Sequence, residues 1–334
     1  MVGKTHVLAI VGPTGAGKSA LAMAAAQLVP IEIVSMDSMQ IYRGMDIGTA
    51  KPTREEQRQV PHHMLDVAEP AEAISVAQYA NLAVSILHEI RARGRLPLLV
   101  GGTGLYLNAL RKGLPLGGAV GSEEVRNRFR AIGEEPGGKA RLHGMLAQVD
   151  ETAAGRLHVN DYRRVIRALE VYEVTGRPIS QQNTESLGHD LIVRPMGVTM
   201  ERDALYQRIN RRVDDMMIRG LLREVESLLK AGVMPGCQSM QGIGYKELVS
   251  VLQGGFPEKE AVALVKRNTR RFAKRQWTWF RREDDIDWFD MSGSNGMAKA
   301  LKMIRRFWET VVPEEGGLHG KDRLPKGKSG GNAV

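Results

Sequence analysis

One short segment constrains this chain more than any other. It consists of the eight residues Gly12, Pro13, Thr14, Gly15, Ala16, Gly17, Lys18 and Ser19, which follow an apolar run at 6–11 and precede an alanine-rich run at 20–26. The glycines let successive backbone N–H groups point at a polyphosphate, and the helix that follows adds its partial positive charge. Lys18 supplies a point charge and Ser19 a hydroxyl for Mg²⁺. The segment predicts a phosphate-binding P-loop between a strand and a helix, but it does not identify the phosphorylated ligand.

The composition bounds the class of protein. With 334 residues, 43% hydrophobic and 25% charged, the chain is long enough for one large domain or two and has the composition of a soluble protein. It shows no membrane span and no secretory pattern, so we expect a cytoplasmic protein. The single cysteine, Cys237, excludes an internal disulfide and a cysteine-rich zinc site. The net charge of +9 indicates a polyanionic partner larger than a nucleotide.

Two further strands are predicted beside the P-loop. Residues 31–35 are rich in β-branched side chains, and residues 96–100 are wholly apolar, as is typical of a buried strand in a parallel sheet. Between them we expect a polar surface loop with a short helix over 44–61 and an amphipathic helix over 75–90, capped by Ser75. The predicted fold class is α/β, a P-loop NTPase-like parallel sheet flanked by helices.

Polar residues follow both of these strands, at the edge where parallel α/β sheets bind their ligands. The carboxylate of Asp37 could act as a base or help position Mg²⁺, and an Asx turn explains it equally well. The hydroxyl of Thr103 could meet the ligand or satisfy the backbone. The second strand ends in Val100, Gly101 and Gly102, without the acidic residue that holds the metal in P-loop hydrolases. This absence disfavours an ATPase or GTPase and favours a loop that grips phosphates while another group reacts.

The second half of the chain is predicted to be mostly helical. Residues 122 to about 184 show helical periodicity and no convincing strand, which predicts an all-helical insertion. The glycine- and lysine-rich residues 313–334 are expected to be disordered. The other expected elements are a strand over 193–199, one long amphipathic helix over 202–231, a basic helix over 257–281, an edge strand over 286–289 and a last helix over 297–308.

Basic residues form three clusters. Residues 266–282 hold eight basic side chains and no acidic one, and the aromatic side chains among them are Phe272, Trp277, Trp279 and Phe280. We expect the aromatic residues to pack in the core and the basic face to contact phosphates, because a merely solvated helix normally mixes both signs of charge. The second cluster is Arg163, Arg164 and Arg167. The third, within reach of the phosphate pocket, is Arg208, Arg211 and Arg212.

Histidine offers little chemistry. His62 and His63 adjoin Asp66, but no third ligand occurs at metal spacing, so we expect no metal site there. The neighbouring Pro61 predicts a structured turn.

Together these motifs resemble the bacterial type of the tRNA dimethylallyltransferase family. The resemblance runs through nearly the whole chain to about residue 310, and the zinc-finger extension of eukaryotic members is absent. Met39 and Met240 are not typical of the family, which affects only local substrate contacts. Besides the P-loop, the matching segments are 37–42, 44–52, 61–63, 99–106, 160–171, 242–247, 273–276 and 279–281.

The resemblance implies a kinase-like core formed by 1–116 and 190–312, with a helical insertion over 117–189 that grips the anticodon arm. The implied reaction transfers a dimethylallyl group from dimethylallyl diphosphate to N6 of the adenosine 3′ of the anticodon in tRNA and releases pyrophosphate, with the base flipped out of the loop. The implied cofactor is Mg²⁺, held by Ser19. The expected partners are tRNA and dimethylallyl diphosphate, and we expect a monomer that binds no membrane.

The resemblance also assigns site residues, in three groups. The catalytic residues are Asp37 at the attacking amine, Thr103 in the reaction channel and Arg212 at the diphosphate. The diphosphate is held by the P-loop, residues 12–19. The residues implied to contact tRNA are Asp37, Ser38, Met39, Gln40, Thr103, Arg126, Asp161, Tyr162, Arg163, Arg164, Val165, Arg167, Gln241, Gly242, Ile243, Gly244, Tyr245, Lys246, Lys274 and Arg275.

Other functions use the same loop. A dimethylallyltransferase acting on free AMP, ADP or ATP would leave the insertion and the basic helix without a role. A P-loop small-molecule kinase would transfer the γ-phosphate of ATP. A noncatalytic RNA-binding module would leave Lys18 and Ser19 unexplained.

Overall fold

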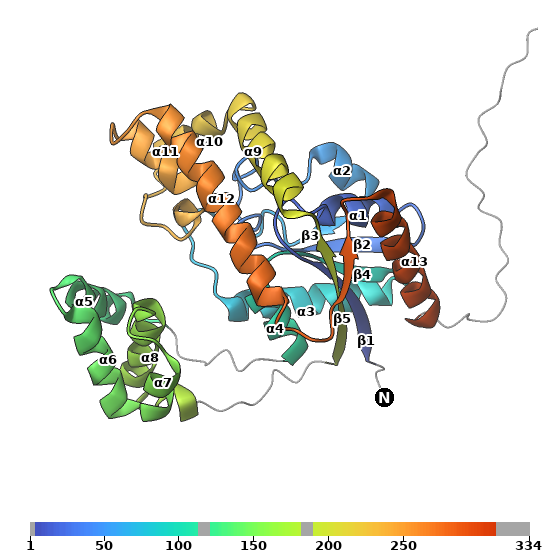
Figure 1. Cartoon of the computed structure of the whole chain (residues 1–334). Helices are drawn as coiled ribbons and strands as arrows, with labels where there is room; N and C mark the ends of the chain where they lie inside the picture. Colours follow the sequence, from blue (N-terminus) through green and yellow to red (C-terminus); the bar gives the residue numbers. More distant parts are fainter. Residues whose placement is uncertain (1–3, 113–120, 182–189, 312–334) are drawn as a thin grey trace, which may run out of the picture.

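The computed structural model describes residues 4–112, 121–181 and 190–311. Its centre is a six-stranded parallel sheet in the order β3-β2-β4-β1-β5-β6 (Figure 1). All four strands expected after the P-loop strand are present, and the predicted α/β fold class is confirmed. The strands are β1 (Thr5–Val11), β2 (Ile31–Met36), β3 (His62–His63), β4 (Leu96–Gly101), β5 (Leu191–Thr199) and β6 (Asp287–Asp290).

Helices cover both faces of the sheet because side chains alternate along each strand. In β1, Val7, Ala9 and Val11 enter one hydrophobic core, while Leu8 and Ile10 enter the other. The first core is completed by α3 (Val76–Ala92), α4 (Gly104–Lys112), α10 (Leu221–Lys230) and α11 (Tyr245–Leu252). The second is completed by α1 (Lys18–Ala25), α13 (Ser294–Val311) and the first half of α9 (Arg202–Ile218).

The segment between β2 and α3 is more deeply anchored than a surface loop. It contains the expected short helix, α2 (Arg54–Gln59), which begins with a capping box at Thr53. Just before it, the buried Lys51 donates to the Tyr42 carbonyl at 2.8 Å and lies 2.6 Å from the carboxylates of Asp46 and Asp66. This buried cation therefore fixes a stretch that the sequence presents only as polar and turn-forming.

Two sequence predictions are wrong. The single helix expected over 202–231 is two helices, α9 and α10, because Gly220 takes a left-handed φ of 99° between them. The apolar pattern continues in phase across this break, which hides it. His62 and His63 form the edge strand β3 rather than a turn, and His63 Nε2 lies 2.6 Å from the Glu32 carboxylate of β2.

Residues 121–181 form a separate helical lobe, drawn in green in Figure 1. Its own hydrophobic core includes Phe129, Leu142, Leu146 and Val165. Strands are absent from this described stretch. The expected limits at 117 and 189, and the tail at 313–334, lie outside the described residues. The helices of the lobe are α5 (Glu123–Glu134), α6 (Gly138–Val149), α7 (Glu151–Arg156) and α8 (Tyr162–Thr175), followed by the short 3₁₀ helix η1 (Ile179–Gln181).

The long helix α12 (Glu258–Phe280) crosses the end of the sheet near α9 (Figure 1). It confirms the predicted basic helix and follows α11 and the 3₁₀ helix η2 (Ser239–Gln241). No helix in the three described ranges is long and apolar enough to cross a membrane.

Candidate active site

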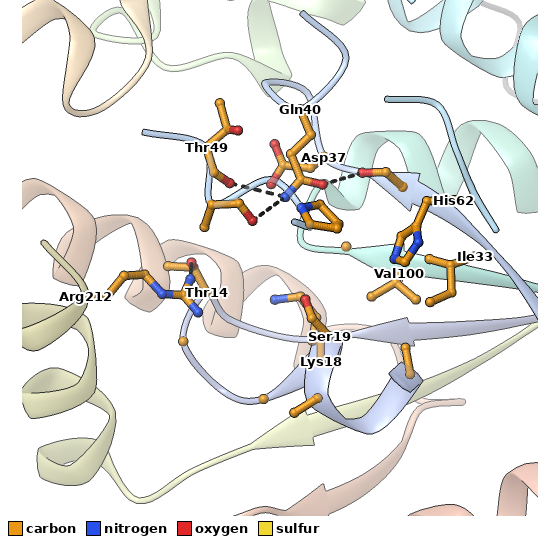
Figure 2. A pocket seen from close by; sticks show the side chains of 18 of the residues that line it. Thr14, Lys18, Ser19, Ile33, Asp37, Gln40, Thr49, His62, Val100 and Arg212 are labelled. Carbon is orange, nitrogen blue, oxygen red and sulfur yellow. Dashed lines mark hydrogen bonds between the residues drawn. The ribbon is translucent and has the colours of Figure 1, made fainter. Parts of the chain in front are cut away.

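The P-loop wraps a small cavity at the carboxyl end of β1. Gly12, Gly15 and Gly17 all have left-handed φ angles, 138°, 85° and 103°, before α1 begins at Lys18. A Cβ at position 12 would lie 2.2 Å from the Val198 carbonyl oxygen of β5, so glycine is required for the strands to close. The cavity has a volume of about 130 Å³, and we call it the cradle. Its polar lining comes from the P-loop, β2, α9 and the segment before α2 (Figure 2).

Lys18 lies beneath the loop that it belongs to. Its Nζ donates to the carbonyls of Gly12 and Pro13, both at 2.9 Å. Burial lowers the pKa of Lys18 to about 8, with Asp37 raising it and Arg212 lowering it further. An anion in the cradle would restore the charged form, because a negative neighbour favours the ammonium ion.

Asp37 reaches the same cradle from the end of β2. Its Oδ1 accepts from the Met39 amide at 2.8 Å, so the Asx turn allowed by the sequence is formed and the carboxylate still lines the cavity. Burial raises the pKa of Asp37 above its ordinary value, against the opposing effects of the Met39 amide and Lys18. A carboxylate with a raised pKa accepts a proton more readily, as a general base must.

Two arginines of α9 complete the cationic side of the cradle. Arg212 Nη1 donates to the Thr14 hydroxyl at 3.4 Å, and Arg208 also lines the cavity. Burial lowers the pKa of Arg212, and the neighbouring Arg208 lowers it further. The third arginine of the predicted cluster, Arg211, faces an adjoining groove instead. Figure 2 shows Lys18, Asp37 and Arg212 arranged around one space.

Gln40 holds the wall of the cradle opposite the P-loop. Its side-chain oxygen accepts from the Ser35 hydroxyl at 2.8 Å, and its amide nitrogen donates to the carbonyls of Thr49 and Ala50, both at 3.2 Å (Figure 2). Behind this wall, the Glu224 carboxylate accepts from the amides of residues 46–48. The wall is therefore fixed from both sides.

Gln276 of α12 supports the P-loop, a role that the sequence analysis did not assign to it. Its buried amide accepts from the Thr14 N–H at 2.8 Å and donates to the Gly102 carbonyl at 3.0 Å. The amide therefore ties the P-loop to the end of β4 and both to the basic helix. The sequence does contain a sign of this role. Gln276 is a neutral polar residue that shares the apolar face of α12 with Ala273 and Phe280, where a polar side chain needs a hydrogen-bond partner.

Three other predicted residues lie near the cradle without lining it. Thr103 follows β4, and its amide donates to the Met36 carbonyl at 3.3 Å, next to Asp37. Ser38 and Met39 are half-buried in the turn after β2, and a Cβ at Gly242 would lie 2.5 Å from the Met39 side chain. His62 lines the cradle, and the described residues contain no group of three His, Cys, Asp or Glu side chains that could hold a metal ion.

A larger cavity, of about 790 Å³, separates the helical lobe from the core, and we call it the interlobe cavity. Four residues that the resemblance assigned to tRNA meet in it: Arg126, Tyr162 and Arg163 from the lobe, and Gln241 from the core. The buried Glu170 orients this surface, because its carboxylate accepts from Arg126 and Arg167, both at 2.9 Å. These two arginines lower the pKa of Glu170 despite its burial.

Some residues assigned to tRNA do not face this cavity. Val165 belongs to the lobe core, Tyr245 is buried with its hydroxyl donating to Glu224 at 2.7 Å, and Gly244 is buried at the start of α11. Their burial leaves little side-chain surface for RNA, so their contact with tRNA stays a prediction. Six more are exposed or half-buried outside this cavity, namely Asp161, Arg164, Arg167, Gly242, Ile243 and Lys246.

The basic face of α12 forms a third depression, of about 440 Å³, which we call the α12 groove. Lys274 and Arg275, both assigned to tRNA, line it with other basic residues and Trp279. The aromatic residues mainly pack inward as expected: Phe280 is fully buried, and Trp277 meets Trp288 edge to face at 4.6 Å between ring centroids.

Comparison with known proteins gives consistent matches. A family model described as IPP transferase matches residues 40–283. A tRNA dimethylallyltransferase of Halalkalibacterium halodurans is 47% identical over 86% of this chain and 92% of its own length. A solved tRNA isopentenylpyrophosphate transferase of Bacillus halodurans is 44% identical with a TM-score of 0.67, covering 92% of this chain and 98% of that one. A solved eukaryotic dimethylallyltransferase acting on tRNA is 27% identical with a TM-score of 0.73, covering 93% and 81%.

Proposed function

Because the chain belongs to the IPP transferase family, we propose that it transfers a dimethylallyl group from dimethylallyl diphosphate to N6 of the adenosine 3′ of the anticodon in tRNA. The observation that carries the chemistry is the convergence of Lys18, Asp37 and Arg212 on one cradle beside a P-loop. A phosphate grip and a carboxylate base in one cavity suit alkyl transfer with a diphosphate leaving group.

In the reaction, the N6 amine attacks C1 of the dimethylallyl group. The new N–C bond forms as the C1–O bond to the diphosphate breaks, and pyrophosphate leaves. Asp37 accepts the proton that the amine loses, which its raised pKa favours. Lys18 and Arg212 neutralise the charge that develops on the departing oxygens.

The cradle also fits Mg²⁺. Ser19 lines it with a hydroxyl oxygen, a hard donor of the kind that Mg²⁺ prefers, and Asp37 lies across the same cavity. With no cluster of three acidic or histidine side chains in the described ranges, the diphosphate itself would supply most of the ligands. When bound, the ion would offset the negative charge that develops on the leaving diphosphate.

The nucleic-acid surfaces favour tRNA over a free nucleotide. The interlobe cavity and the α12 groove both carry arginines, and neither is needed to hold AMP. We propose that residues 117–189 act as the domain that grips the anticodon stem-loop, with Arg126, Tyr162 and Arg163 at its inner face. The residues that contact RNA on the core would be Gln241, Lys274 and Arg275. We place the enzyme in the cytoplasm as a monomer.

A labelled-transfer assay tests this function. The full chain, Mg²⁺, labelled dimethylallyl diphosphate and unmodified tRNA should give labelled tRNA, and excess AMP should not compete. Label in AMP instead would favour the free-nucleotide reaction, and γ-phosphate transfer from labelled ATP would favour a kinase. Absence of transfer to every tRNA tested would contradict the proposal.

A further inference from the structure

A groove lined by arginines adjoins the cradle along α9, and we call it the α9 groove. Its volume is about 700 Å³, against about 130 Å³ for the cradle. Ala50, Arg208 and Arg212 line both, so the two spaces share a wall. The two arginines of this wall can therefore face an anion on either side of it.

The groove carries a row of cations without matching acids. Arg208, Arg211 and Arg219 make no ion pair within the described residues, and Asp215 is the only acidic side chain in the lining. Spacings of three and four residues place these side chains on one face of α9. Other arginines of the described core are paired with acids, as Arg93 is with Glu32 and Arg111 with Glu283. An unpaired row beside a phosphate site indicates an anionic ligand.

The position of the groove decides between a small anion and RNA. It shares no lining residue with the interlobe cavity or with the α12 groove, which carry the residues proposed to contact tRNA. It shares three with the cradle. The ligand that must travel between solvent and cradle is a diphosphate, so a small anion explains both the charge of the groove and the wall that it shares with the cradle.

We propose that the α9 groove is a diphosphate-binding site outside the cradle, in which Arg211 and Arg219 hold the anion before Arg208 and Arg212 take it over. The shared chemistry is a diphosphate group, whether on incoming dimethylallyl diphosphate or on departing pyrophosphate. This inference rests on the proposed function for the identity of the substrate, but binding of a diphosphate can be measured without any transfer. Arg211 and Arg219 are exposed, so their substitution leaves the core intact.

The test compares the full chain with the double variant Arg211→Gln/Arg219→Gln. A matched control, Lys302→Gln/Arg306→Gln, removes two exposed positive charges from α13, so both variants lower the net charge by two. Calorimetric titration with inorganic pyrophosphate and Mg²⁺ should show affinity about tenfold weaker for the α9 variant at low salt. At about 500 mM salt the difference should largely disappear, because salt then screens the attraction between exposed charges that are more than a few ångströms apart. The control should bind as the unmodified chain does.

Steady-state kinetics then separates the two sources of the anion. Capture of the substrate predicts a lower kcat/KM for dimethylallyl diphosphate with kcat unchanged, whereas passage of the product predicts a lower kcat. Equal pyrophosphate affinity in the α9 variant and the control would overturn the proposal. So would an α9 variant in which only the KM for tRNA rises. If the unmodified chain binds pyrophosphate but transfers nothing to tRNA, the proposed function fails while the groove is still tested by titration.

Discussion

The amide of Gln276 offers a sharp test of how the P-loop is held. Gln276→Met keeps the length and volume of the side chain but removes both hydrogen bonds, to the Thr14 N–H and to the Gly102 carbonyl. Each backbone group left without a partner in a buried place costs about 1–3 kcal/mol, so the two together cost about 2–6 kcal/mol. We expect this cost to appear in two quantities: part lowers the free energy of unfolding, and part weakens ligand binding because the P-loop is less ordered.

The share that falls on the loop appears in ligand binding. If the loop bears about 1.4 kcal/mol, the affinity for pyrophosphate falls about tenfold. Urea unfolding measures the loss of unfolding free energy. Calorimetric titration with pyrophosphate and Mg²⁺ measures the loss of affinity. Gln276→Glu should weaken pyrophosphate binding at least as much, because the ionised carboxylate still accepts from the Thr14 N–H but repels both the Gly102 carbonyl oxygen and the diphosphate.

The control is Gln27→Met, which makes the same change at an exposed position with no side-chain hydrogen bond in the described structure. It should leave both measurements unchanged. If Gln276→Met folds and binds pyrophosphate as tightly as the unmodified chain, the amide does not position the loop and the reasoning is wrong.

Three further predictions concern the site. Asp37→Asn should lower kcat by roughly 10² to 10⁴ with little change in tRNA affinity, and single-turnover transfer with a separate tRNA-binding measurement checks this. Lys274→Gln/Arg275→Gln should weaken tRNA binding and make its salt dependence less steep, by about one unit of slope for each cation that contacts a phosphate, as binding at several salt concentrations will show. Because only the ammonium form of Lys18 attracts a diphosphate and its pKa is about 8, affinity for dimethylallyl diphosphate should fall as pH rises through that value. Lys18→Arg should remove this pH dependence, and a flat profile in the unmodified chain would contradict the assignment.

Local pattern was enough to predict most of the elements. Glycine readily takes a left-handed backbone, and all three glycines of the P-loop have it. Ser75 caps α3 through the capping box that its spacing with Gln78 allows. The apolar run at 96–100 is a central strand because both of its faces are covered. These features depend on neighbours within a few residues, so the sequence displays them directly.

Contacts between distant segments were not visible in the same way. Gln276 meets Thr14 across 262 residues of sequence, and no periodicity marks such a pair. The Glu224 carboxylate that holds residues 46–48 comes from α10 and looks like an ordinary surface acid on its helix. The break at Gly220 was hidden because the apolar face of α9 continues into α10. The residues that line the cradle were therefore predicted better than the residues that hold them in place.

Gly101 and Gly102, at the end of β4, form a local sequence motif that permits contacts between distant segments. β4 lies between β1 and β2, so Asp37 must meet the P-loop across the end of that strand. A Cβ on Gly101 would lie 2.0 Å from the Met36 carbonyl oxygen, and one on Gly102 would lie 2.0 Å from Gln276 Nε2. Bare backbone at both positions thus lets the end of β2 and helix α12 close over β4. A P-loop hydrolase carries its metal-holding acid at the end of such a strand. A side chain at Gly102 would push Gln276 off the loop, so the absence of an acid at the end of β4 and the approach of the Asp37 carboxylate to the cradle both depend on these two glycines.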